Sequence, residues 1–293
     1  MNYSLDALWW ELQTDAVRDL ASLLTAPSLW QTDCELSRRE LLGDTGFRYL
    51  LALDNKPGVL QQYLQAASRQ SHRLGFYAEH LLAFWFAHAP HCQLLGQNIV
   101  LQEAANTPTI GALDYVTRIN DTLYHLELTC KYYAHRSADP HGLRGIQAKD
   151  TLASKAAKLT QQLALHEHPV FAAWCEAQQL QQADLQAASM VRGMGFWLGD
   201  VVQSPINPYA WRGEYLENQA AWPHIEGCRY AAIPSKRLLS PLRLPHEATL
   251  AHGQASSENS VWWAQLQQRP DGHWHEISRS MCLQNAQTGF NLT

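Results

Sequence analysis

Residues 110–133 read IGALDYVTRINDTLYHLELTCKYY, and this stretch decides the fold. Two runs rich in β-branched and aromatic residues, 110–119 and 122–133, flank the dipeptide Asn120-Asp121. Asn and Asp tolerate the backbone angles of a tight hairpin turn, and the flanking residue types favour strands. The stretch therefore predicts two antiparallel strands joined by a short turn.

Two kinds of side chain alternate along the second predicted strand. Because successive side chains of a strand point to opposite faces, one face of this strand is apolar and the other is polar. A solvated sheet surface gives the same pattern, so the alternation alone favours a structural explanation over a chemical one. The apolar face carries Leu126, Leu128 and Cys130, and the polar face carries His125, Glu127, Thr129 and Lys131.

Asp114 lies in the middle of the otherwise apolar first strand. If the strands pair through the Asn120-Asp121 turn, Asp114 falls opposite Glu127, with the two side chains ~5 Å apart. Carboxylates that close repel each other unless a cation or a proton intervenes, which favours a divalent metal such as Mg²⁺ or Mn²⁺. A bound metal activates water for phosphodiester cleavage, and Lys131 is the candidate lysine for stabilising the developing phosphate charge.

The elements around the hairpin predict a mixed α/β core in the order helix, three strands, helix, strand. Apolar periodicity and proline positions define the helices, and short apolar runs define the strands. The expected helices are 5–25, a stretch opening at Pro57, 71–87 and 148–166, and the further strands are 94–101 and 190–198.

Beyond Pro205 the sequence predicts a β-rich extension, in which Pro270-Asp271-Gly272 forms a turn between two strands. The expected strands there are 230–233, 261–267 and 273–283, with a loop at 246–260. We therefore expect an N-terminal helical region at 1–70, the core at 71–204, and a C-terminal β-rich extension packed on the core at 205–293.

This order of elements and acidic residues resembles the PD-(D/E)XK nuclease-like superfamily. Four stretches are also similar to a bacterial domain-of-unknown-function family, number 1853, that is assigned to this superfamily. The most specific of them is residues 73–85, RLGFYAEHLLAFW, and the others are 110–116, 127–133 and 150–163. The resemblance implies an α/β fold with a restriction-endonuclease-like core and a metal-dependent nuclease that acts on DNA or RNA.

Carried over position by position, the resemblance implies three metal-binding acids and two catalytic lysines. Glu79 is the acid of the helix that leads into the sheet, Asp114 the central metal ligand and Glu127 the third ligand. Lys131 completes the motif that Glu127 begins, Lys155 of the following helix is an accessory catalytic residue, and Gln162 is a weaker candidate. The structural alternatives are a helix-surface acid for Glu79 and a solvated helix face for Lys155.

One departure from the superfamily pattern concerns the third motif. The superfamily separates the acid and the lysine by one residue, whereas Glu127 and Lys131 are four positions apart, ~13 Å along a strand. Thr129 occupies the position where the acid is expected, and Ala112 stands where related nucleases often have a glutamate. Both residues weaken the expectation of cleavage.

Composition restricts the classes of partner. The formal net charge of −5 excludes a protein coated in basic surface, so nucleic acid would have to be bound by a local patch such as residues 118–158. The six cysteines include no C-x-x-C pair, which argues against a zinc site or a disulfide framework. The N-terminal stretch lacks the features of a signal peptide, and no apolar run reaches the ~18 residues of a membrane span. We expect a cytoplasmic protein with no membrane partner.

Two functions are consistent with these features. The first is a nuclease that uses Mg²⁺ or Mn²⁺, which the expected pairing of Asp114 and Glu127 favours. The second is a catalytically impaired member of the same fold that binds nucleic acid or protein, which Thr129 and Ala112 favour. Fold alone does not decide between them.

Overall fold

A computed structural model of the chain describes residues 11–67, 73–104, 107–146, 150–217, 225–251 and 261–282. Its α-helices are α2 (Asp15–Thr25), α3 (Arg38–Leu42), α4 (Gly46–Asn55), α5 (Gly58–Ala67), α6 (Leu74–His88), α7 (Leu152–Leu163) and α8 (Phe171–Ala177). Its strands are β1 (Cys92–Leu101), β2 (Gly111–Ile119), β3 (Thr122–Ala134), β4 (Leu185–Phe196), β5 (Arg212–Leu216), β6 (Arg229–Ala232), β7 (Arg243–Leu244), β8 (Trp262–Gln268) and β9 (Trp274–Cys282). No helix within these ranges is long and apolar enough to cross a membrane.

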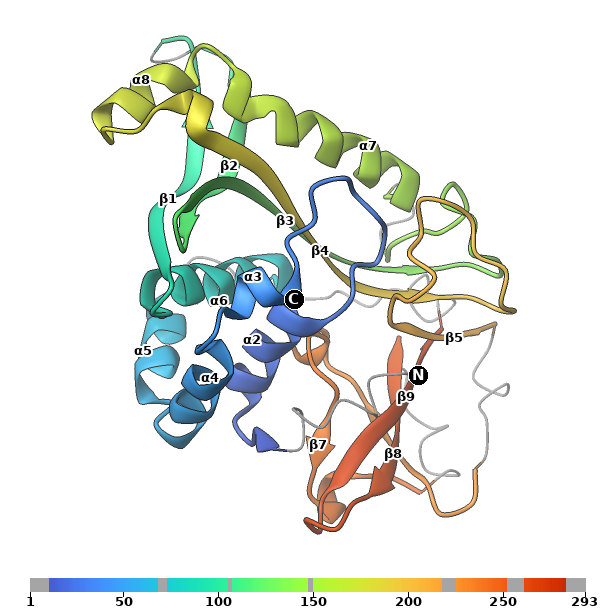
Figure 1. The fold of residues 1–293 in the computed structure, drawn as a ribbon. Helices are drawn as coiled ribbons and strands as arrows, with labels where there is room; N and C mark the ends of the chain where they lie inside the picture. Colours follow the sequence, from blue (N-terminus) through green and yellow to red (C-terminus); the bar gives the residue numbers. More distant parts are fainter. Residues whose placement is uncertain are drawn as a thin grey trace.

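The fold is mixed α/β, with the strands joined in one mostly antiparallel sheet (Figure 1). The strand order is β1-β2-β3-β4-β5-β9-β8-β6, and β7 pairs with β9. Strands β3, β4, β5 and β9 pair in parallel, and the other neighbours are antiparallel. The C-terminal strands therefore extend the sheet that β1 to β4 form, on the side of β4.

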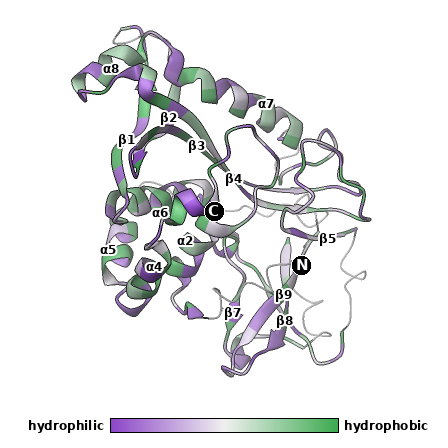
Figure 2. Ribbon diagram, in the orientation of Figure 1, coloured by the Kyte–Doolittle hydropathy of each residue, from purple (hydrophilic) through white to green (hydrophobic). Residues whose placement is uncertain are grey.

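Helices α6 and α7 cover opposite faces of β3. Leu126 packs in one apolar cluster with Phe84 of α6, and Tyr133 packs in another with Leu152 and Leu159 of α7. Residues 126 and 133 differ by an odd number, so their side chains leave β3 on opposite faces. Figure 2 shows hydrophobic and hydrophilic residues alternating along α7, as in a helix with one face on a sheet.

The predicted hairpin is confirmed. Residues 111–119 and 122–134 form β2 and β3, and Asn120 at the turn has a φ of 51°. The register pairs Ile119 with Thr122 and ends at Tyr115 with Leu126. Beyond that pair β2 stays bonded only to β1, and β3 only to β4. The sheet therefore opens between β2 and β3.

The predicted helix over residues 5–25 is interrupted: Glu11 is helical, residues 12–14 are not, and α2 begins at Asp15. The backbone N–H groups of Gln13 and Thr14 donate to the carboxylate of Asp54, at 2.9 and 2.8 Å. This cap from α4 gives those groups the acceptors that a longer helix would have supplied. Residues 1–10 of the prediction lie outside the described residues.

Two other elements differ in their bounds, and three helices were not predicted. The helix expected at 148–166 begins at Leu152, after a capping box between Thr151 and Ser154, and ends in a 3-10 turn, Ala164–Glu167. The strand expected at 190–198 already begins at Leu185. The unpredicted helices are α3, α4 and α8. Residues 252–260 of the loop expected at 246–260 lie outside the described ranges.

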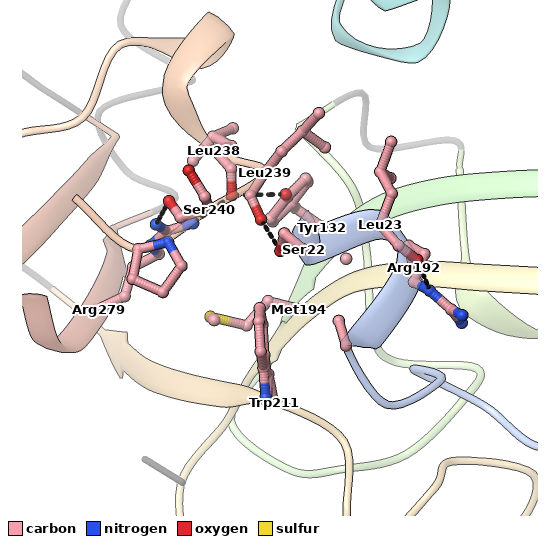
Figure 3. Close-up of a pocket in the computed structure, with 13 residues that line it drawn as sticks. Ser22, Leu23, Tyr132, Arg192, Met194, Trp211, Leu238, Leu239, Ser240 and Arg279 are labelled. Atoms are coloured by element: carbon pink, nitrogen blue, oxygen red, sulfur yellow. Dashed lines mark hydrogen bonds between the residues drawn. The ribbon is translucent and has the colours of Figure 1, made fainter. Parts of the chain in front are cut away.

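The segment 238–241 ties the C-terminal strands to α2 and β3 (Figure 3). The Leu238 carbonyl accepts from the Tyr132 hydroxyl at 2.8 Å and from the Arg279 guanidinium at 2.6 Å. The Leu239 carbonyl accepts from the Ser22 hydroxyl at 2.5 Å. Three regions distant in sequence thus share one buried hydrogen-bonded junction.

Gly193 allows β4 to lie against β3. Its φ is +120°, and a Cβ atom there would lie 1.7 Å from the backbone oxygen of Lys131. Gly193→Ala is therefore expected to lower the free energy of unfolding by about 3 kcal/mol or more, measured by urea denaturation. Gly199→Ala is the matched control, because Gly199 also has a positive φ but no atom within 4 Å of its Cβ position. A similar loss in both variants would show that conformational strain, not the contact with β3, explains the effect.

Candidate active site

Asp114 and Glu127 lie where β2 and β3 separate. The backbone N–H of Asp114 donates to Glu127 Oε1 at 3.1 Å, and the backbone N–H of Leu128 donates to Asp114 Oδ2 at 2.9 Å. Buried N–H groups need acceptors, and here carboxylate oxygens replace the carbonyl oxygens of a regular ladder. The same bonds that close the end of the hairpin hold the two acids against each other.

Glu127 is buried at 1% exposure and receives three N–H donors. Oε1 accepts from the Asp114 backbone and from His125 Nε2 at 2.8 Å, and Oε2 accepts from Gln162 Nε2 of α7 at 2.9 Å. Each of these donors favours the ionised carboxylate. Gln162 Oε1 is also buried and has no hydrogen-bond partner among the described residues.

The three acids perturb one another. Burial, followed by the charge of Glu127, raises the pKa of Asp114 to about 7. Burial raises the pKa of Glu127 to about 7, although its contacts with Asp114 oppose the rise. Burial and the charges of Asp114 and Glu127 raise the pKa of Glu79 to about 7. The interaction between the two carboxyl groups raises the pKa of Asp114 and opposes the rise at Glu127, so a proton shared by the pair relieves the repulsion between them.

Glu79 approaches the cluster from α6. The backbone carbonyl of Glu79 accepts from the Tyr115 hydroxyl at 2.7 Å, which fixes this turn of α6 against β2. The Glu79 carboxylate itself accepts no hydrogen bond from the residues that the structure describes. It lines a cleft of about 440 Å³ whose walls include Lys131 and Asp150.

The two predicted lysines have different partners. Lys131 Nζ lies 2.6 Å from Asp150 Oδ2, and both side chains are partly exposed. Lys155 of α7 acts on all three acids, since its charge lowers the pKa of Glu79, Asp114 and Glu127. Burial in turn lowers the pKa of Lys155. The structure therefore brings Glu79, Asp114, Glu127 and Lys155 together, and leaves Lys131 paired on the wall of the cleft.

Sequence reasoning assigned no role to His125 or Asp150 and gave Gln162 little weight. His125 precedes Glu127 by two residues, so the strand alternation already placed both side chains on one face. Asp150 has no comparable signal, because its contact with Lys131 depends on the path of the loop between β3 and α7.

No three His, Cys, Asp or Glu side chains are close enough to hold a metal ion by themselves within the described part of the chain. The half-buried Asp114 and the buried Glu127 nevertheless form a pair, with Glu79 as a third charge. Such a group can bind a cation that keeps water or phosphate oxygens among its ligands.

A family model described as "Domain of unknown function (DUF1853)" matches residues 18–283. No curated protein and no solved structure matches the chain. The matched range contains every residue of the candidate site.

Proposed function

The chain belongs to the DUF1853 family, and we propose that it is a divalent-metal-dependent nuclease of the PD-(D/E)XK type, which hydrolyses phosphodiester bonds of DNA or RNA. The observation that carries the proposal is the half-buried Asp114 beside the buried Glu127 at the point where β2 and β3 separate, with the charge of Lys155 of α7 acting on both. A purely structural role does not explain a buried carboxylate held against a second, half-buried one.

The order of elements supports the finer fold assignment. Helix α6, strands β1 to β3, helix α7 and strand β4 follow one another in the order that the superfamily resemblance implies. The acids come from α6, β2 and β3, and the lysine comes from α7. We therefore assign a restriction-endonuclease-like core to this half of the molecule as part of the proposal.

The residues fit Mg²⁺ or Mn²⁺. Mg²⁺ is usually held by one or two carboxylates, with waters and substrate phosphates completing its shell, so a full protein cage is not required. Asp114 and Glu127 supply two carboxylates, whose shared proton a cation would replace. The unpartnered Gln162 Oε1, whose amide already contacts Glu127, would supply a further oxygen beside the pair.

Each residue then has a chemical task. A bound Mg²⁺ or Mn²⁺ supplies an activated water and neutralises phosphate charge. Asp114 and Glu127 bind the ion, and Glu79 adds negative charge on the side of the cleft. Lys155 places its ammonium where it stabilises the additional charge on the phosphate in the transition state. Lys131 and Asp150 line the cleft through which the nucleic-acid backbone approaches.

A second candidate function has its own supporting observation. Thr129 stands at the expected acid position, and the motif lysine, Lys131, is paired with Asp150. These features favour a nuclease-fold protein that binds nucleic acid or protein without cutting. The experiment that tests the first proposal also tests this one.

The test is incubation of the purified protein with linear and circular duplex DNA, single-stranded DNA and RNA, in Mg²⁺, in Mn²⁺ and in EDTA. We expect cleavage of at least one substrate that requires the metal and is lost in Asp114→Asn. Cleavage that persists in Asp114→Asn would contradict the site assignment. Salt-dependent binding without cleavage of any substrate would support the second function instead.

A further inference from the structure

A buried pair of histidines lies behind Glu127. His125 of β3 is 0% exposed and His166 of the 3-10 turn Ala164–Glu167 is 8% exposed. Their Nδ1 atoms are 3.4 Å apart, and their ring centroids are 5.3 Å apart. His166 Nδ1 also lies 2.8 Å from the backbone oxygen of Leu163, the last residue of α7. A continuous path of contacts thus runs from the end of α7 to Glu127 Oε1.

The Leu163 carbonyl determines the protonation pattern of this path. A carbonyl oxygen only accepts, so His166 Nδ1 carries the proton. His125 Nδ1, 3.4 Å from this N–H group, is then the nitrogen placed to accept from it. A neutral imidazole has one N–H, so His125 is protonated at Nε2 and donates to Glu127 Oε1 at 2.8 Å.

The arrangement resembles the way in which neighbouring groups orient metal ligands in other proteins. With the Asp114 N–H and His125 both on Oε1, that oxygen has two donors and the carboxylate cannot rotate without losing both. Oε2, which has the single donor Gln162, keeps capacity for a further ligand. The bonds on Oε1 therefore decide which oxygen of Glu127 faces the cation.

We propose that His125, held in its Nε2–H tautomer by His166 and the Leu163 carbonyl, is the positioning residue that orients the Glu127 carboxylate for cation binding. That this orientation serves cation binding rests on the proposed function. The tautomer of His125 and the orientation of Glu127 do not depend on that function. His125 touches neither substrate nor cation and acts through Glu127.

Two substitutions separate orientation from packing. The amide nitrogen of glutamine in His125→Gln reaches as far from the backbone as Nε2 and can still donate to Glu127. The shorter asparagine of His125→Asn reaches only as far as Nδ1 and cannot. Both replace the ring by a polar amide, so a role in packing alone would lower stability and cation affinity alike in the two variants.

The first measurement is Mn²⁺ affinity by calorimetry. We expect His125→Asn to bind Mn²⁺ about 10- to 100-fold more weakly than wild type, and His125→Gln to stay within about threefold, as is typical for loss and retention of a group that orients a metal ligand. Unfolding curves check that both variants are folded. Equal losses of affinity in the two variants, or no loss in His125→Asn, would overturn the proposal.

The second measurement uses metal-free protein and is independent of the proposed function. Nitrogen NMR of the imidazole rings is expected to show His125 protonated at Nε2 and unprotonated at Nδ1. The carboxyl carbon resonance of Glu127, assigned with Glu127→Gln, is expected to move in His125→Asn and to stay near its wild-type position in His125→Gln. If wild type binds no Mn²⁺, the proposed function fails while these spectra still decide the role of His125. An Nδ1-protonated His125, or a Glu127 resonance indifferent to both variants, would refute it.

Discussion

Lys155→Met is expected to slow single-turnover cleavage by about 100-fold or more, because it removes a cation that stabilises charge in the transition state. Lys131→Met is expected to cost less than about 10-fold, since the Lys131 ammonium is already bonded to Asp150 at the wall of the cleft. Methionine keeps most of the length and the apolar stem of lysine in both variants. Rates under saturating enzyme, in Mg²⁺, measure the difference.

The affinity for Mn²⁺ provides the control for this comparison. Lys155 repels a cation bound at Asp114 and Glu127, so its removal is expected to leave Mn²⁺ binding unchanged or tighter while cleavage falls. A misfolded variant would lose both. A larger rate loss in Lys131→Met than in Lys155→Met would contradict the assignment and return Lys131 to the role that the sequence motif predicts.

The hairpin and its acid pair could be predicted because they depend on local rules. The turn at Asn120-Asp121 fixes the register, whose last pair is Tyr115 with Leu126, so Asp114 and Glu127 are the next residues on the two strands. The opening of the sheet beyond Tyr115 could not be predicted. It depends on β1 and β4 drawing β2 and β3 apart, and those contacts come from distant parts of the chain.

The choice between the two lysines was beyond sequence reasoning for a related physical reason. Strand alternation predicted that Lys131 lies on the same face as Glu127. It could not predict the ion pair of Lys131 with Asp150, which is nineteen residues further along the chain. Lys155 depends on how α7 crosses β3, which is set by packing of Leu152 and Leu159 under Tyr133. The capping of Thr14 by Asp54 is a similar case, because a bond over forty residues leaves no local pattern.

At pH 8, Asp114→Asn is expected to make the metal-free protein more stable than wild type by about 2 kcal/mol. The substitution removes a carboxylate whose ionised form is disfavoured by burial, which raises the pKa of Asp114 to about 7. A raised folded-state pKa contributes stability at low pH that is lost as the pH rises through that value. The free energy of unfolding of wild type should therefore fall between pH 5 and pH 8 relative to that of the variant. Urea denaturation in EDTA at several pH values measures this difference, in which the titration of distant groups largely cancels.

The same substitution should have the opposite effect once a cation is present. Asparagine keeps the oxygen that accepts the Leu128 N–H, and its amide can donate to Glu127 as the shared proton does, so the variant stays folded. At pH 8, Mn²⁺ at 100 times its Kd stabilises wild type by about 2.7 kcal/mol, whereas a variant that does not bind it gains nothing. Asp150→Asn is the control, because it removes a carboxylate outside the acid pair and should neither stabilise the metal-free protein nor abolish the gain from Mn²⁺. If Asp114→Asn destabilises the metal-free protein at pH 8, the acid pair serves the fold and not the cation, since only a binding site keeps like charges buried at a cost to its own stability.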